Sequence, residues 1–293
     1  MEHKKHLVIV DGMALLFRSY FATAAMGHFF KNSQGIPTNA VQGYLRHVMT
    51  IVKHFDPTHL VVSWDMGAKT FRNEVYPEYK AHRPAPDAEL VPQFDMTRQA
   101  SELMGYLNIG MEQMEADDVI GSLVAQYSED YQITIVSGDK DLFQLLRPNV
   151  TIALIKKGYS EYELYDEARF VAEYGFTPEQ YVDYKAFIGD TADGYPGVKG
   201  IGPKTAAGLI QSYHTIEGIL AAKDQLTKGV QKKLTEQEDM LHISYQLAAI
   251  RTDLMLTIDE EAARVPEWTS TQLEAMEALE YSLVVKYRSS LYC

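Results

Sequence analysis

Cysteine is almost absent from this sequence, and long apolar runs are absent altogether. The 293 residues include one cysteine, Cys293, so no internal disulfide can form, which is consistent with a reducing cytoplasm. No apolar run approaches the roughly 20 residues that a membrane span needs, and the polar stretch 1–6 is unlike a signal peptide. We therefore expect a cytoplasmic protein with no membrane partner.

Basic residues are also scarce relative to acidic ones. Lys and Arg number 27 against 40 Asp and Glu, so the formal net charge is −13. Taken alone, this balance argues against a nucleic-acid partner. However, nine of the acidic residues belong to one predicted cluster, described below, so the remaining surface can still carry basic stripes.

Three apolar, strand-like runs each lead into aspartate. The runs are 7–10, 60–64 and 133–137, and they lead into Asp11, into Asp65, and into Asp139 with Asp141. Their alternation with helical stretches predicts an α/β fold, with a mainly parallel central sheet and flanking helices. Because the carboxyl ends of such strands border one crevice, we expect these carboxylates to gather there.

A further acidic run, 115–118, opens a helical stretch, where the helix dipole favours negative charge. Simple helix capping is the alternative interpretation of this run. Gathered anions repel one another unless a cation lies among them, and oxygen-only ligands suit Mg²⁺ or Mn²⁺. A cluster this dense can hold two ions, an arrangement suited to phosphodiester cleavage. Its proposed members are Asp11, Asp65, Glu115, Asp117, Asp118, Asp139, Asp141, Asp190 and Asp193.

The Gly-rich stretch 196–206 is the most specific local signal. Gly200 and Gly202 flank Ile201 in a predicted tight turn before a helix start, whose N–H groups can bind phosphate. Together with the basic Lys199 and Lys204 this favours a helix-hairpin-helix that grips the DNA backbone. A P-loop is the rival, but Pro203 interrupts its pattern, and a plain Gly-rich connection is the third reading. The predicted DNA contacts are Lys199, Gly200, Gly202, Lys204 and Thr205.

The stretch 67–92 is polar, basic and interrupted by proline, and it is long for a connection between a strand and a helix. It is therefore a candidate lid or arch. We expect Arg72, Lys80 and Arg83 to clamp phosphates and Tyr79 to stack on a splayed base. A solvated loop is the alternative.

These features together resemble the flap endonuclease and 5′–3′ exonuclease family. The resemblance is closest to the N-terminal nuclease domain of bacterial DNA polymerase I and its stand-alone relatives, and it covers residues 6–258. The stretches that carry it are Val10-Asp11-Gly12 with Phe17-Arg18, Asp65 with Phe71-Arg72, Tyr79 to Arg83, Glu115 to Asp118, Ser137 to Leu142, and Gly189 to Ala206. One departure is Gly194, where the family commonly has asparagine.

The resemblance implies a PIN-like, resolvase-like nuclease fold with a helical arch and a helical helix-hairpin-helix region. We expect an α/β nuclease domain at 1–167 with the arch at about 67–100, the helix-hairpin-helix region at 168–258 and a cap at 259–293. The resemblance also implies two Mg²⁺ ions, replaceable by Mn²⁺, on the nine acids, and a K⁺ at the carbonyls of Val198 and Ile201.

The implied activity is structure-selective 5′–3′ exonuclease and flap endonuclease cleavage by a monomer associated with the nucleoid. Its partners would be DNA with 5′ flaps, 5′ ends or RNA primers, during replication and repair. The predicted catalytic residues are Lys80, Arg83, Asp11, Asp65 and Asp139. Two alternatives remain: a non-catalytic DNA-junction binder with a vestigial metal site, and a phospho-receiver or phosphatase on an α/β sheet.

Overall fold

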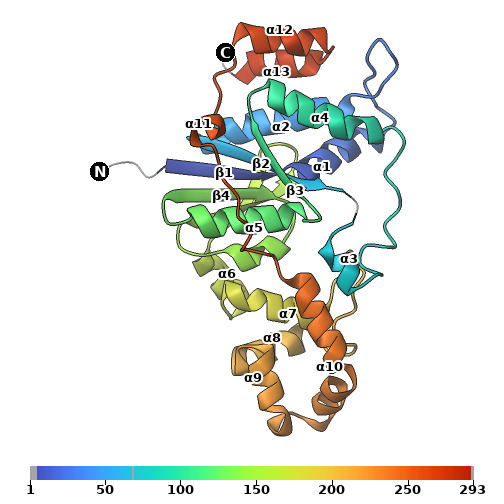
Figure 1. Ribbon diagram of the computed structural model, residues 1–293, viewed down its shortest axis with the longest axis vertical. Helices are drawn as coiled ribbons and strands as arrows, with labels where there is room; N and C mark the ends of the chain where they lie inside the picture. Colours follow the sequence, from blue (N-terminus) through green and yellow to red (C-terminus); the bar gives the residue numbers. More distant parts are fainter. Residues whose placement is uncertain (1–4, 68, 292–293) are drawn as a thin grey trace.

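A six-stranded sheet forms the centre of the protein, as the computed structural model shows (Figure 1). The structure describes residues 5–67 and 69–291, so Cys293 lies outside it. The strand order is β3-β2-β1-β4-β5-β6, and every pairing is parallel except β5 with β6. The strands are β1 (Lys5–Asp11), β2 (His59–Met66), β3 (Leu107–Glu112), β4 (Tyr131–Ser137), β5 (Val150–Lys157) and β6 (Glu161–Tyr165). The predicted α/β fold with a mainly parallel sheet is confirmed.

Helices cover both faces of the sheet. Helices α1 (Gly12–Ala24), α2 (Asn39–Phe55) and α4 (Val91–Leu103) lie over one face, and α5 (Ala116–Tyr127) lies over the other (Figure 1). Side chains of a strand alternate between the faces, so Val8 and Val10 pack with the first group while Leu7 and Ile9 pack with α5. Each such buried aliphatic side chain contributes roughly 1.5–3 kcal/mol to folding.

The register of the central strands brings their carboxyl ends to one edge. Asp11 of β1 pairs with Ser63 of β2, and Val10 pairs with Val136 of β4. Asp65 and Asp139 follow two and three residues after these positions. The three aspartates therefore leave the sheet at the same edge, as the apolar runs predicted.

The predicted arch contains two helices joined by irregular chain. The helices are α3 (Phe71–Val75) and α4, and the residues between them form turns and extended segments. The arch is thus helical at its two ends and not throughout.

A smaller helical region follows the sheet and carries the helix-hairpin-helix. Thr177 caps the short helix η2 (Pro178–Gln180), and its own N–H donates to the Gln180 side chain at 2.9 Å. The other elements are η1 (Asp141–Leu145), α6 (Glu167–Tyr174), α7 (Tyr181–Ile188), α8 (Pro203–Tyr213), α9 (Ile216–Ala221), η3 (Lys223–Gln225) and α10 (Lys228–Ala248). After these, α11 (Glu260–Ala263) leads to α12 (Ser270–Ala278) and α13 (Ser282–Leu291).

The C-terminal helices return to the sheet domain. Helix α13 packs on α2, where the Tyr287 and Thr50 hydroxyls are 2.6 Å apart and the Leu283 N–H donates to Gln42 Oε1 at 3.0 Å. Among the helices that the structure describes, none has both the length and the apolar character needed to cross a membrane.

Candidate active site

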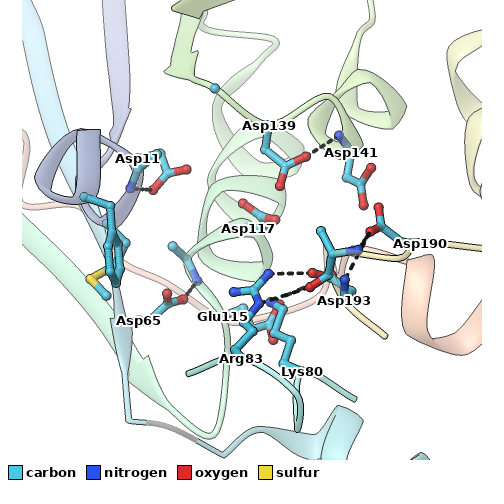
Figure 2. A pocket seen from close by; sticks show the side chains of 16 residues that line it. Asp11, Asp65, Lys80, Arg83, Glu115, Asp117, Asp139, Asp141, Asp190 and Asp193 are labelled. Atoms are coloured by element: carbon cyan, nitrogen blue, oxygen red, sulfur yellow. Dashed lines mark hydrogen bonds and ion pairs between the residues drawn. The ribbon is translucent and has the colours of Figure 1, made fainter. Parts of the chain in front are cut away.

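A cavity of about 390 Å³ opens at the carboxyl edge of the sheet. Eight of the nine predicted acidic residues line it, together with two basic residues (Figure 2). The acids come from the edge of the sheet, from the start of α5 and from the helical region, and the basic residues come from the arch. The acids are Asp11, Asp65, Glu115, Asp117, Asp139, Asp141, Asp190 and Asp193, and the basic residues are Lys80 and Arg83.

The strand-end aspartates are fixed by hydrogen bonds from neighbouring elements. Asp11 caps α1 by accepting from the Ala14 N–H at 2.9 Å, and it also accepts from the Ser137 hydroxyl at 2.7 Å. Asp65 accepts from the Ala116 N–H at the start of α5 at 2.6 Å. These bonds leave further carboxylate lone pairs that can face the cavity.

The remaining acids come from helix ends and tight turns. Asp139 accepts from the Asp141 N–H at 2.7 Å, which holds the loop after β4 in a turn. Asp190 and Asp193 share a closed turn after α7, where the Asp190 carboxylate accepts from the Asp193 N–H at 3.1 Å. Glu115 caps the start of α5 and Asp117 lies in its first turn, so both carboxylates are close to the positive end of the helix dipole.

Asp118 does not belong to this cavity, which corrects the prediction of nine acidic ligands. Its side chain is fully buried and receives two bonds from Arg72, at 2.7 and 2.9 Å. Arg72 is only 2% exposed and also donates to the carbonyls of Leu247 and Ala249. It therefore cannot contact DNA as predicted, because it is buried and its four hydrogen bonds form a link between α3, α5 and the end of α10.

Tyr79 is the second correction. Its ring is buried and its hydroxyl donates to Asp193 at 2.9 Å and to Glu115 at 3.2 Å. It is therefore not available for stacking on a base; it holds two cavity acids in place. The neighbouring Lys80 ammonium lies 2.9 Å from Glu115, and the Arg83 guanidinium lies 2.6 Å from Asp193. Both predicted phosphate-binding cations are thus at the cavity.

The electrostatics of the cavity reflect crowding of like charges. Burial raises the pKa of Asp11 to about 6, and burial with the nearby Asp139 raises the pKa of Asp141 to about 7. Burial, Asp139 and Asp11 raise the pKa of Asp117 well above its usual range. Despite burial, the hydrogen bond from Lys185 lowers the pKa of Asp190. The cavity therefore has a strong demand for positive charge at neutral pH.

The raised pKa values predict that the stability of the metal-free protein falls as the pH rises from acidic to neutral. The folded-state pKa values of Asp11 and Asp141 lie above their ordinary value of 3.8, so the folded protein binds protons that the unfolded chain lacks. Their contribution to stability is complete at acidic pH and is lost between about pH 4 and pH 7. We expect the thermal midpoint in EDTA to fall over this range, and to fall less in Asp141→Asn. If the thermal midpoint of wild type and of Asp141→Asn changed equally with pH, the raised pKa could not belong to Asp141.

The donor set fits hard divalent cations. All eight acidic side chains offer oxygen, the ligand type that suits Mg²⁺ and Mn²⁺. Within the described residues, no three acidic side chains yet converge as one ion would require, and Lys80, Arg83 and Lys185 pair with four of them. The oxygen ligands suit a metal centre, and the basic residues Lys80, Arg83 and Lys185 pair with half of the acids.

The helix-hairpin-helix lies beside this cavity in α7 and α8. Lys199, Gly200, Gly202, Lys204 and Thr205 are all exposed at the hairpin. The side chains of Val198 and Ile201 are buried beneath it, and the Ile201 N–H donates to the Val198 carbonyl at 3.0 Å. The predicted DNA contacts therefore share one surface, and their role stays a prediction.

Sequence patterns missed three residues at these sites. Lys185 of α7 contacts two cavity acids. Gln237, at a kink in α10, accepts from the Lys199 N–H at 2.8 Å, and Lys233 donates to the Gly200 carbonyl at 2.6 Å. All three lie in helical stretches outside the acidic and Gly-rich motifs, so no local motif marks them.

Gly194 closes the Asp190 turn with φ +82°, a conformation that suits glycine or asparagine. A β-carbon there would lie 2.9 Å from His82 and 3.2 Å from the Glu78 carbonyl. We expect Gly194→Ala to lose about 1–2 kcal/mol of unfolding free energy from backbone strain alone. Gly208→Ala, within α8 and with open space around it, is the matched control and should gain up to about 1 kcal/mol. Urea unfolding measures both; a neutral Gly194→Ala would exclude the close approach.

Comparison with known proteins places this geometry in one family. The family model for the 5′–3′ exonuclease N-terminal resolvase-like domain matches residues 6–175, and that for the 5′–3′ exonuclease C-terminal SAM fold matches residues 176–271. The chain is 47% identical over 250 residues to the 5′–3′ exonuclease of Bacillus subtilis, covering 85% of this chain and 84% of that protein.

Less similar proteins also match most of this chain. The chain is 39% identical over 264 residues to DNA polymerase I of Bacillus caldotenax, covering 88% of this chain but 30% of the polymerase. Among solved structures, T5 5′-exonuclease with bound zinc has a TM-score of 0.67 at 23% identity, with 98% of each chain covered. The Rad2 catalytic core with DNA substrate has a TM-score of 0.61 at 15% identity, covering 99% of this chain and 91% of that one. These two support the fold. On the family models and the Bacillus subtilis relative, the chain belongs to the 5′–3′ exonuclease family.

Proposed function

We propose that this protein is a structure-selective 5′–3′ exonuclease and flap endonuclease that hydrolyses phosphodiester bonds in DNA and in RNA primers. The main support for this proposal is the cavity that eight carboxylates line together with Lys80 and Arg83. Such a cavity repels a nucleic-acid phosphate unless cations offset its charge. It therefore suits a metal-dependent nuclease better than a phosphate-binding site without metal. Its setting would be replication and repair at the nucleoid.

Two Mg²⁺ ions, which Mn²⁺ can replace, are the proposed cofactors. The eight acids that line the cavity would hold them. When bound, such ions lower the pKa of a water molecule and stabilise charge on the leaving oxygen.

Lys80 and Arg83 would supply the phosphate contacts from the protein itself. Their side chains are 27% and 51% exposed at the mouth of the cavity, and Glu115 and Asp193 hold them over it. A phosphodiester entering the cavity would exchange these carboxylate partners for its own oxygens. Donors held where charge develops stabilise a transition state without reorganisation.

The exposed hairpin would hold the duplex beside the cleavage site. Lys199 and Lys204 lie beside the N-terminus of α8, where backbone N–H groups favour phosphate. A K⁺ at the Val198 and Ile201 carbonyls would add positive charge. In this proposal residues 168–258 serve duplex binding, residues 1–167 serve cleavage and residues 259–293 form a cap, in one monomer.

The test is product mapping on a labelled double-flap DNA with a free or a blocked 5′ end. We expect cleavage in Mg²⁺ that leaves a 5′-phosphate, no cleavage in EDTA, and retained duplex binding in both. An RNA-primed flap is run in parallel to compare the two substrates. Binding without cleavage on addition of Mg²⁺ would instead identify a DNA-junction binder, and phosphate release from a small phosphomonoester would identify a phosphatase.

A further inference from the structure

Lys185 is a buried lysine that joins two acids of the cavity. It lies in the last turn of α7 and is 6% exposed. Its ammonium is 2.7 Å from Asp141 Oδ1 and 2.5 Å from Asp190 Oδ2. These acids come from η1 and from the turn after α7, so one cation holds two separate elements together.

The acids of the cavity fall into two halves that differ in their partners. The open half comprises Asp11, Asp65, Asp117 and Asp139, and the paired half comprises Glu115, Asp141, Asp190 and Asp193. Among the described residues, each acid of the paired half has an ion pair with a basic side chain, whereas the acids of the open half have none.

Within the paired half, Lys185 differs from Lys80 and Arg83. Those two side chains belong to the irregular arch and are 27% and 51% exposed, so they can swing outward. The Lys185 side chain is 8% exposed and its backbone lies in a helix, where the Lys185 carbonyl accepts from the Gly189 N–H at 2.8 Å. Burial therefore leaves the Lys185 ammonium less room to move into solvent than Lys80 or Arg83 has when it is displaced from its carboxylates.

An ammonium and a divalent ion cannot share this position. Mg²⁺ requires carboxylate oxygens at about 2.0–2.1 Å, and the ammonium already occupies the point where the Asp141 and Asp190 oxygens approach each other. A divalent ion placed beside the Lys185 ammonium would also be repelled strongly by it, because the site is partly buried.

We propose that Lys185 is a resident counter-ion of the Asp141–Asp190 pair that a second divalent ion must displace. The open half then binds its ion first and tightly, and the paired half binds weakly in the absence of nucleic acid. A displaced ammonium needs another anion, and an incoming phosphodiester supplies one. Lys185 is thus a positioning residue that makes occupation of the second ion position depend on substrate. The inference rests on the proposed metal dependence.

The test measures Mn²⁺ binding without nucleic acid. Titration calorimetry on wild type should give one tight and one weak site. Lys185→Met removes the charge, and we expect it to tighten the weak site by at least about tenfold. Lys185→Gln, which keeps a hydrogen-bond donor, should show the same change. Lys232→Met is the control, because the Lys232 side chain is 74% exposed and, among the residues that the structure describes, its one ion pair is with Glu236 at 3.7 Å.

The outcomes separate this inference from the proposed function. A wild-type protein that binds no Mn²⁺ would overturn the metal-dependent function itself. Two sites in wild type, with the weak site unchanged or weaker in both Lys185 variants, would overturn the role of Lys185 alone. A variant that folds only in Mn²⁺ supports the proposal, since the ion then replaces the ammonium, and a variant that stays unfolded in Mn²⁺ contradicts it.

Discussion

Replacement of Asp117 by asparagine is expected to abolish cleavage and, at the same time, to stabilise the metal-free protein. Asp117 lies at the first turn of α5 and lines the cavity. Burial, Asp139 and Asp11 raise its pKa, so the charged form is unfavourable in the folded state. An asparagine removes this repulsion and should raise the unfolding free energy in EDTA at pH 7.5.

Cleavage should respond in the opposite direction. The amide oxygen of asparagine is a much weaker ligand than a carboxylate, so we expect flap cleavage in Mg²⁺ to fall on the order of 10³-fold or more. The gain in thermal midpoint on adding Mn²⁺ should shrink in the same variant. A loss of activity together with a gain in stability cannot come from general misfolding, which would lower both.

Asp95→Asn is the matched control, because the Asp95 side chain is 79% exposed and outside the cavity. It should leave both the EDTA midpoint and the cleavage rate unchanged. Full activity in Asp117→Asn would remove Asp117 from the metal centre. Destabilisation in EDTA would show that its charge is compensated in a way that the described contacts do not include.

The sheet and most of the cavity were predictable because the signals are local. An apolar run that ends on aspartate marks both a buried strand and the edge where it stops, which placed Asp11, Asp65 and Asp139 correctly. The sequence analysis missed strand β3 because that strand lacks such a local signal. Its sequence, Leu107–Glu112, has no continuous apolar run, and its residues are partly exposed at the edge of the sheet.

The errors came from residues whose partners are distant in sequence. Glu115 and Asp118 were both predicted as members of the acidic cluster, but only Glu115, which precedes α5 as its cap, lines the cavity. The Asp118 carboxylate instead turns back to the Glu115 N–H at 3.1 Å and inward to Arg72. Spacing alone cannot reveal this, because the choice depends on a buried cation 46 positions earlier in the chain.

The buried Arg72–Asp118 pair leads to the second large effect. Arg72→Met is expected to lower the unfolding free energy by about 3–5 kcal/mol, because it leaves Asp118 as an uncompensated buried charge. It also removes the donors to the Leu247 and Ala249 carbonyls, and unsatisfied buried acceptors are costly. The link between the arch, α5 and the end of α10 would be lost together with this pair.

A double variant distinguishes loss of charge balance from loss of packing. Arg72→Met with Asp118→Leu removes both charges, so it should recover a large part of the stability that Arg72→Met loses. Urea unfolding of wild type, both single variants and the double variant gives the coupling energy directly. Arg98→Met is the control, because its 3.4 Å pair with Asp95 is exposed and such pairs contribute only about 0–1 kcal/mol. If Arg72→Met cost no more than Arg98→Met, the Arg72 guanidinium could not be the link between these elements, and its predicted contact with DNA would have to be reconsidered.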